Sequence, residues 1–249
     1  MANDLAVDCA AVSKRFYIYE RSHASLRQLF IQAALRRLPP ADRPYFAITD
    51  FNLQVRRGEA VAILGHNGCG KSTVLRLIAG VYAPTTGSVR TYGRVATVIE
   101  LGAGFHPELT GSENIRLYGA ILGLHRSELD ARHDAVVAFA DIGNFIETPV
   151  KYYSSGMQAR LAFAVAVCVE HEILLLDEVL AVGDEAFRRK CFDHLVHYHA
   201  RGGTLVIASH DLDTVRRLCS RAIWMQQGRI VMSGDVHQVA DAYHASHLG

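Results

Sequence analysis

A glycine-rich stretch at residues 65–73, Gly-His-Asn-Gly-Cys-Gly-Lys-Ser-Thr, constrains this chain more than any other feature. It matches the pattern G-x-x-x-x-G-K-[ST], whose glycines let backbone N–H groups converge on an anion without obstruction by a Cβ atom. The lysine of this pattern reaches the β- and γ-phosphates of a nucleoside triphosphate, and the next hydroxyl can bind Mg²⁺. The sequence therefore predicts a triphosphate-binding loop made of Gly65, His66, Asn67, Gly68, Cys69, Gly70, Lys71, Ser72 and Thr73.

The residues around this loop indicate the fold class. The apolar run 60–64 is typical of a buried strand that leads into the loop, and residues 73–79 are typical of the helix that leaves it. The positive end of that helix would point at the phosphates. Strands and helices continue to alternate along the chain, which predicts an α/β fold with a mostly parallel sheet covered on both faces. Two further strands are expected at 5–12, as an edge strand, and at 47–55.

Composition excludes several classes of protein. The 26 basic residues nearly balance the 25 acidic ones, which does not favour a nucleic-acid partner. The five cysteines are scattered without a C-x-x-C pair, so we expect free thiols in a reducing compartment. No apolar run approaches the ~18–20 residues that span a bilayer, and the start of the chain has no apolar signal core. We therefore expect a soluble cytosolic subunit.

Two later motifs carry groups suited to phosphate chemistry. The apolar run 173–176 ends in Asp177 and Glu178, of which the first can hold Mg²⁺ opposite Ser72 and the second can polarise an attacking water. Ser154 and Gly156 precede a nearly all-apolar helix at 157–169, and a hydroxyl and an N–H group at a helix start form a second anion site. The structural alternative for Asp177 and Glu178 is a solvent-exposed acidic strand end. The alternative for Ser154 is an ordinary helix N-cap.

These motifs, in this order, resemble those of the ATP-binding subunits of ABC transporters. The run 153–157, Tyr-Ser-Ser-Gly-Met, is similar to their L-S-G-G-Q signature, although a serine and a methionine replace its first glycine and its glutamine. His210, after the apolar run 205–208, resembles the switch histidine that contacts the γ-phosphate. Asp184 matches the aspartate of their D-loop.

The resemblance implies an arrangement as well as an activity, which is ATP hydrolysis coupled to transport. An ABC ATPase domain would cover residues 1–235, with an antiparallel N-terminal β subdomain and a helical subdomain at about 102–165, before a short C-terminal helix at 236–249. Two copies would pair head to tail, each ATP and its Mg²⁺ lying between Lys71 of one copy and Ser154 and Gly156 of the other. Adenine would stack on Phe16, with Tyr17 or Tyr19 as alternatives.

One branch of this family is similar in finer detail. Glu100 stands where most ABC subunits carry glutamine, and the run 100–115 resembles exporters of polysaccharides or polyol phosphates, such as O-antigen, capsule and teichoic acid. This implies a lipid-linked polysaccharide as cargo and two copies of a membrane-spanning permease as partners. The subunit would lie at the cytoplasmic face of the inner membrane. The carboxylate of Glu100 would ligate Mg²⁺ or repel the γ-phosphate, and we expect it mainly to relay nucleotide state to the permease.

Two further features of the chain are similar to this branch. Residues 21–45 form an insertion with an amphipathic stretch and a basic tip, which either meets lipid phosphate or lies as a solvated helix against the domain edge. The chain ends soon after the last expected helix, which is typical of the short form without a C-terminal carbohydrate-binding domain.

Two other classes of function would also use a phosphate loop. An ABC ATPase for another cargo would share the nucleotide site, but the run 100–115 and the insertion 21–45 disfavour it. A soluble P-loop enzyme such as a kinase would pass phosphate to an acceptor other than water, and neither the signature-like run nor His210 is expected in such an enzyme.

Overall fold

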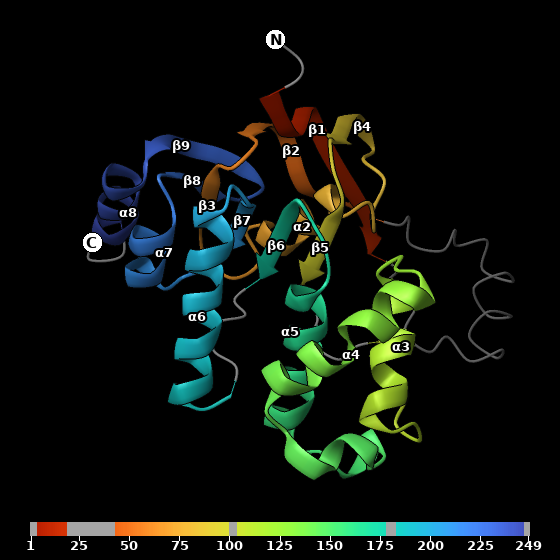
Figure 1. Ribbon diagram of the computed structural model, residues 1–249. Helices are drawn as coiled ribbons and strands as arrows, with labels where there is room; N and C mark the ends of the chain where they lie inside the picture. Colours follow the sequence, from red (N-terminus) through yellow and green to blue (C-terminus); the bar gives the residue numbers. More distant parts are fainter. Residues whose placement is uncertain (1–3, 19–42, 100–103, 178–182, 247–249) are drawn as a thin grey trace, which may run out of the picture.

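The computed structural model describes residues 4–18, 43–99, 104–177 and 183–246. This part of the chain contains two sheets and a group of helices (Figure 1). The antiparallel sheet has the order β2-β1-β4, with strands β1 (Leu5–Ile18), β2 (Arg43–Arg56) and β4 (Thr86–Thr91). The second sheet has the order β5-β6-β7-β3-β8-β9, with strands β5 (Val95–Val98), β6 (Ile173–Asp177), β7 (Thr204–Ala208), β3 (Ala60–Leu64), β8 (Arg221–Gln226) and β9 (Arg229–Asp235).

The six-stranded sheet is parallel except at β9, which pairs antiparallel with β8. Its strand β3 lies between β7 and β8, and every residue of β3 and of β7 is buried. Short, wholly apolar strands are what a parallel sheet needs when helices cover both of its faces. The predicted α/β fold with a mostly parallel core sheet and an antiparallel N-terminal sheet is therefore confirmed.

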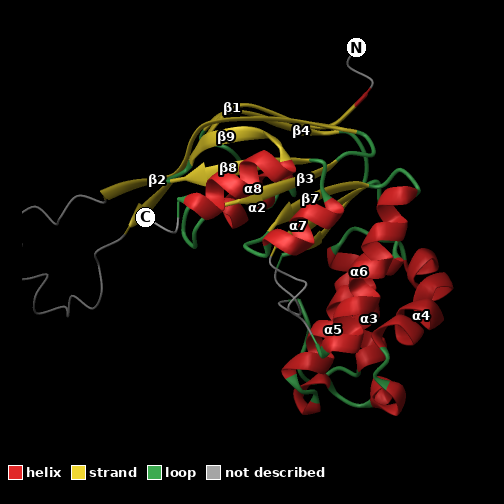
Figure 2. Ribbon diagram, turned by 90° about the vertical axis from the view of Figure 1, so that its left-hand side faces the viewer, coloured by secondary structure: helices red, strands yellow, loops and turns green. Residues whose placement is uncertain are grey.

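Alternate residues of the sheet strands enter two different cores. One core lies between the two sheets and encloses helix α2 (Lys71–Ile78), with members such as Phe51, Ile63 and Leu75. The other lies on the opposite face, where Leu174 and Leu176 pack against side chains of four helices. These helices are α5 (Ser155–Cys168), α6 (Glu185–Ala200), α7 (Leu212–Leu218) and α8 (Val236–Ala245). Figure 2 shows the three-stranded sheet at one end of the molecule and the helical group at the other.

A helical group extends away from the sheets beside α6, and its helix α5 also packs on the core sheet (Figure 1). It consists of α3 (Gly111–Ile121), α4 (Arg126–Ala140), the 3₁₀ turns η2 (Gly143–Glu147) and η3 (Val150–Tyr152), and α5. From Leu161 onward α5 is apolar all round, as expected of a helix buried on most sides, and Phe163 is fully buried. No helix of the described residues is long and apolar enough to span a membrane.

The prediction of an edge strand at residues 5–12 is wrong. Strand β1 continues to Ile18 and pairs with β2 on one side and β4 on the other, so it is the central strand of its sheet. Its pairing shifts register around Ala11, which has a left-handed φ of 48°. A bulge of this kind bends and twists a strand, which allows β1 to extend as a two-stranded ribbon with β2. Residues 21–42 of the insertion predicted at 21–45 lie outside the described residues, and its last three residues begin β2.

Candidate functional site

The glycine-rich loop joins β3 to α2, at the carboxyl edge of the parallel sheet. Gly68 and Gly70 have left-handed φ angles of 80° and 111°, which side chains with a Cβ atom rarely adopt. A Cβ atom on Gly70 would also lie 2.6 Å from Ile48 Cδ1 and 2.8 Å from the carbonyl oxygen of Ala47. Position 70 therefore requires glycine for two reasons, its left-handed backbone angle and its close approach to β2.

Lys71 is held on the inner side of the loop. Its side chain is only 5% exposed, and its Nζ donates to the carbonyl oxygens of Gly65 at 2.8 Å and His66 at 3.3 Å. Because α2 begins at Lys71, the cation lies beside the positive end of a helix. Two sources of positive potential therefore coincide where the sequence predicts bound phosphates.

A hollow of about 600 Å³ opens in front of this loop, a size suited to a small-molecule site. The loop supplies one side of it, including Lys71, Ser72 and Thr73. Asp177, the last residue of β6, supplies a carboxylate to the same hollow. Ser72 and Asp177 are hard oxygen ligands of the kind that Mg²⁺ prefers, so the residues present fit this metal.

Aromatic side chains form another wall of the hollow, and sequence reasoning found only one of them. Phe16 on β1 and Tyr45 on β2 are directly paired across the ribbon, and both line the hollow. Tyr45 was missed because the second strand was predicted to begin at Ala47. The aromatic pair that follows Pro44 is the sequence feature that could have identified Tyr45 as part of the strand.

Tyr17 lies on the opposite side of this ribbon, because successive residues of a strand point to opposite faces. Its ring is covered by the Arg15 guanidinium at 4.9 Å, whereas the ring of Phe16 packs edge-on against Tyr82 at 5.4 Å. Of the three aromatic residues proposed to stack on adenine, Phe16 lines the hollow, Tyr17 does not, and Tyr19 lies outside the described residues.

Ser154 and Gly156 lie at the start of α5 and do not line this hollow. The Ser154 hydroxyl caps the helix by accepting a hydrogen bond from the Met157 N–H at 3.2 Å. A Cβ atom on Gly156 would meet only the Ser154 Oγ within 4 Å, at 3.8 Å. Packing within one copy therefore does not require glycine here, and the surface in front of the helix start is open.

His210 and Asp184 do not line this hollow. His210 lies two residues beyond β7 and lines a different hollow, of about 800 Å³, which also includes Ser209 and Asp211. Asp184 caps α6, accepting from the Phe187 N–H at 2.9 Å, and forms an ion pair with Arg160 at 2.8 Å. Two other predicted site residues, Glu100 and Glu178, lie outside the described residues.

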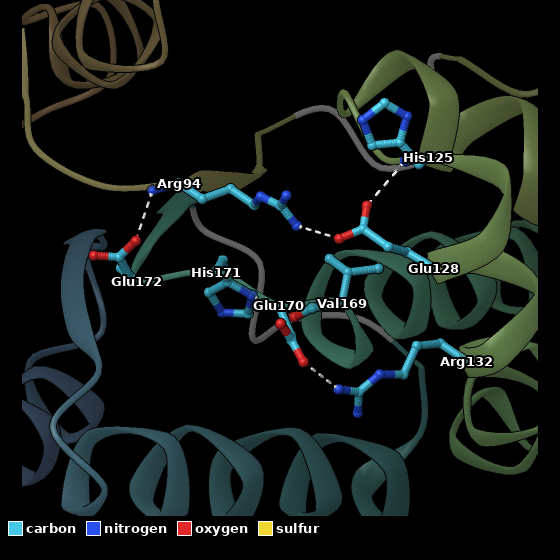
Figure 3. A network of polar contacts seen from close by, with 8 residues as sticks. All are labelled: Arg94, His125, Glu128, Arg132, Val169, Glu170, His171 and Glu172. Carbon is cyan, nitrogen blue, oxygen red and sulfur yellow. Dashed lines mark hydrogen bonds and ion pairs between the residues drawn. The ribbon is translucent and has the colours of Figure 1, made fainter.

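A third hollow, of about 700 Å³, lies at the amino ends of β5 and β6, away from the phosphate loop. Ion pairs from α4 lie beside it: Glu128 pairs with Arg94 at 2.9 Å and Arg132 pairs with Glu170 at 2.7 Å (Figure 3). Burial lowers the pKa of His171 in this hollow to about 4. Because these charges are mostly paired with each other, the hollow is a junction between the helical group and the sheet rather than part of the phosphate-loop site.

A phosphate loop on a central parallel strand, with an acidic strand end beside it, defines a nucleotide-binding P-loop protein. The model of the family described as ABC transporter matches residues 48–181. That match spans more than half of the chain, and the chain belongs to the ABC transporter family.

Curated relatives are similar over most of the chain. The O-antigen export system ATP-binding protein RfbB of Klebsiella pneumoniae is 42% identical over 237 residues, which cover 95% of this chain and 96% of that protein. The ABC transporter protein AbcA of Aeromonas salmonicida is 47% identical over 207 residues, or 83% of this chain and 67% of that protein. The teichoic acids export ATP-binding protein TagH of Lactiplantibacillus plantarum is 39% identical over 98% of this chain, which spans 65% of that protein.

Solved structures share the fold at lower identity. A dimeric ATP-binding cassette in a post-hydrolysis state, bound to ADP and Pi, superposes with a TM-score of 0.74 at 22% identity. The superposition covers 92% of this chain and 98% of that one. This likeness identifies the architecture of the chain as that of an ABC cassette.

Proposed function

We propose that this chain is the ATP-binding and ATP-hydrolysing subunit of an ABC transporter that exports a lipid-linked polysaccharide across the inner membrane. The observation that carries the proposal is the similarity to the Klebsiella O-antigen export protein along nearly the whole of both chains. The similarity to TagH proteins supports the same class of cargo, a glycan or polyol phosphate carried on a lipid.

The described residues support a division of roles within one copy. The loop from Gly65 to Thr73 would hold the triphosphate, and Phe16 with Tyr45 would hold the base at the aromatic wall. Ser72 and Asp177 would hold Mg²⁺, which neutralises phosphate charge when bound. Glu178, next to Asp177 in the sequence, would polarise the attacking water, and His210 would contact the γ-phosphate.

A second copy would complete each site. Ser154 and Gly156 lie outside the nucleotide hollow of their own chain, yet they form an open helix start with a hydroxyl and backbone N–H groups. A γ-phosphate presented by another copy suits this place, because a helix N-terminus attracts anions. We infer a head-to-tail homodimer that binds two permease subunits, and through them the cytoplasmic face of the inner membrane.

The aromatic wall gives a prediction on ATP affinity. Replacing Tyr45 by alanine is expected to raise the KM for ATP about tenfold and to leave kcat at saturating ATP within about twofold, because an aromatic ring stacked on a base contributes on the order of 1–3 kcal/mol. Phe16→Ala should act in the same direction. The measurement is steady-state ATP hydrolysis over a range of ATP concentrations.

Tyr17→Ala is the matched control for this prediction. Tyr17 is 46% exposed and Tyr45 is 48% exposed, and both belong to the same ribbon, but Tyr17 lies on the face away from the hollow. The control should keep the wild-type KM. Equal KM changes in Tyr17→Ala and Tyr45→Ala would contradict the assignment of the base to this wall.

The proposed cargo is tested in the assembled transporter. The chain is co-expressed with a candidate permease subunit, and the purified complex is placed in lipid vesicles. We expect a complex with two copies of each subunit, whose ATP turnover rises when a polyprenyl-linked glycan is added. Turnover that ignores the glycan but responds to an unrelated cargo would overturn the polysaccharide assignment and leave the ATPase assignment intact.

A further inference from the structure

Strands β8 and β9 and helix α8, in the C-terminal part of the fold, contact the phosphate loop at two places. The turn between β8 and β9 has two residues with left-handed φ, Gln227 at 48° and Gly228 at 75°. Within this turn the Gly228 N–H donates to the carbonyl oxygen of Cys69 at 2.9 Å, and the Gly228 carbonyl accepts from the Thr49 N–H at 2.9 Å. The turn thus joins the late part of the loop to β2.

Helix α8 contacts the early part of the loop through aromatic rings. The ring of His66 packs edge-on against Tyr243 of α8, with 6.0 Å between centroids and 62° between planes. Tyr243 packs in the same manner against Trp224 of β8, at 6.0 Å and 68°. Tyr243 is only 6% exposed, so it presents a fixed surface to the exposed His66 side chain.

The position of His66 affects the phosphate-binding lysine. His66 follows Gly65 and is separated from Gly68 by a single residue, and a Cβ atom on Gly68 would have no neighbour within 4 Å. The His66 carbonyl accepts from Lys71 Nζ at 3.3 Å and from the Cys69 N–H at 3.2 Å. A change in the backbone position of His66 would therefore move the carbonyl that accepts from Lys71 and the turn that presents the backbone N–H groups.

We propose that Tyr243 is a positioning residue for ATP binding, which acts by holding the His66 ring and so the phosphate loop. The inference rests on the proposed function, because it concerns how the same site binds ATP. Tyr243 does not line the nucleotide hollow. It acts through His66, and the conformation of the loop before ATP arrives depends on how α8 is seated on β8.

The test replaces the ring of Tyr243 while keeping an apolar side chain. Tyr243→Leu is expected to weaken binding of ATP about three- to tenfold, because an edge-to-face aromatic pair contributes on the order of 0.5–1.5 kcal/mol beyond its buried area. KM should rise by the same factor, and kcat at saturating ATP should stay near wild type, because bound ATP holds the loop. Tyr243→Phe keeps the ring and should restore wild-type affinity.

Val239→Ala separates this role from a loss of stability. Val239 belongs to the same helix and is fully buried in the same core, so its truncation destabilises the fold without removing the contact with His66. A melting experiment is run on every variant beside the titration with ATP. If Val239→Ala and Tyr243→Leu lose stability to a similar degree and also lose affinity equally, Tyr243 has no positioning role.

A double-mutant cycle identifies the partner of Tyr243. His66→Ala should weaken ATP binding as Tyr243→Leu does, and the double variant should be no weaker than either single variant. Additive losses would overturn the inference. A wild-type protein that binds no ATP would instead refute the proposed function, whereas wild-type binding with unchanged binding in Tyr243→Leu would refute only the positioning role.

Discussion

Lys71→Ala and Gly156→Asp are each expected to abolish ATP hydrolysis, and mixing the two variants is expected to restore it. In a head-to-tail pair, one site would combine both lesions and the other would combine neither. Random pairing would make half of the dimers mixed, so about one quarter of all sites would be intact. The measurement is ATP turnover of the separate and mixed proteins, after exchange of subunits, at equal total concentration.

The two substitutions are chosen so that each copy still folds. Lys71→Ala removes a cation from the loop and leaves an apolar side chain on α2. The space around a Cβ atom on Gly156 is open, and an aspartate in the first turn of α5 complements the positive end of the helix. The same negative charge would repel a γ-phosphate placed there by the partner copy.

A variant that carries both substitutions is the control for the mixing experiment. Mixed with either single variant, it can form no intact site, so turnover should stay at the background level. Restored activity in that control would show that the assay contains another ATPase. Full turnover by Gly156→Asp alone, in a protein that dimerises, would refute the shared site.

Glu178→Gln is expected to lower kcat by about 10²–10⁴, because removing a general base has an effect of that size. Affinity for ATP should stay within about twofold, since the triphosphate would still be bound by the loop and the metal. Dimers with trapped ATP should therefore accumulate, which size-exclusion chromatography in the presence of ATP and Mg²⁺ measures directly.

Glu172→Gln is the matched control for Glu178→Gln. Glu172 lies at the other end of β6, exposed, where it pairs with Arg57 at 2.7 Å. Losing a carboxylate there changes the net charge equally but should leave kcat unchanged. A kcat for Glu178→Gln within a few-fold of wild type would assign the base to another residue.

The sequence predicted the phosphate loop and its flanking elements because local chemistry dictates them. The apolar run 60–64 can be little other than a buried strand, and the glycines around it permit one compact turn. The acidic end of β6 was predicted for the same reason. The structure brings Asp177 to the hollow beside Ser72, whereas the roles of Glu178 and Glu100 stay predictions.

Pairings between distant segments could not be predicted in this way. The alternation of β1 shows that one face is buried, but it does not show how many neighbours the strand has, and β4 lies about 70 residues further along the chain. Tyr45 was missed because its strand extends only where β1 continues beside it. The contact between His66 and Tyr243 joins residues that no local pattern connects.

The order of the central sheet has a consequence for synthesis. Strand β3, which carries the phosphate loop, pairs with β7 and β8, so both of its neighbours are complete only once residue 226 has been translated. Parallel pairing between segments so far apart in the sequence is slow, and until it happens the strand that carries the loop has no paired neighbours. A nascent chain still missing its last strands should therefore be unable to trap nucleotide, and acquisition of ATP binding would mark the completion of folding.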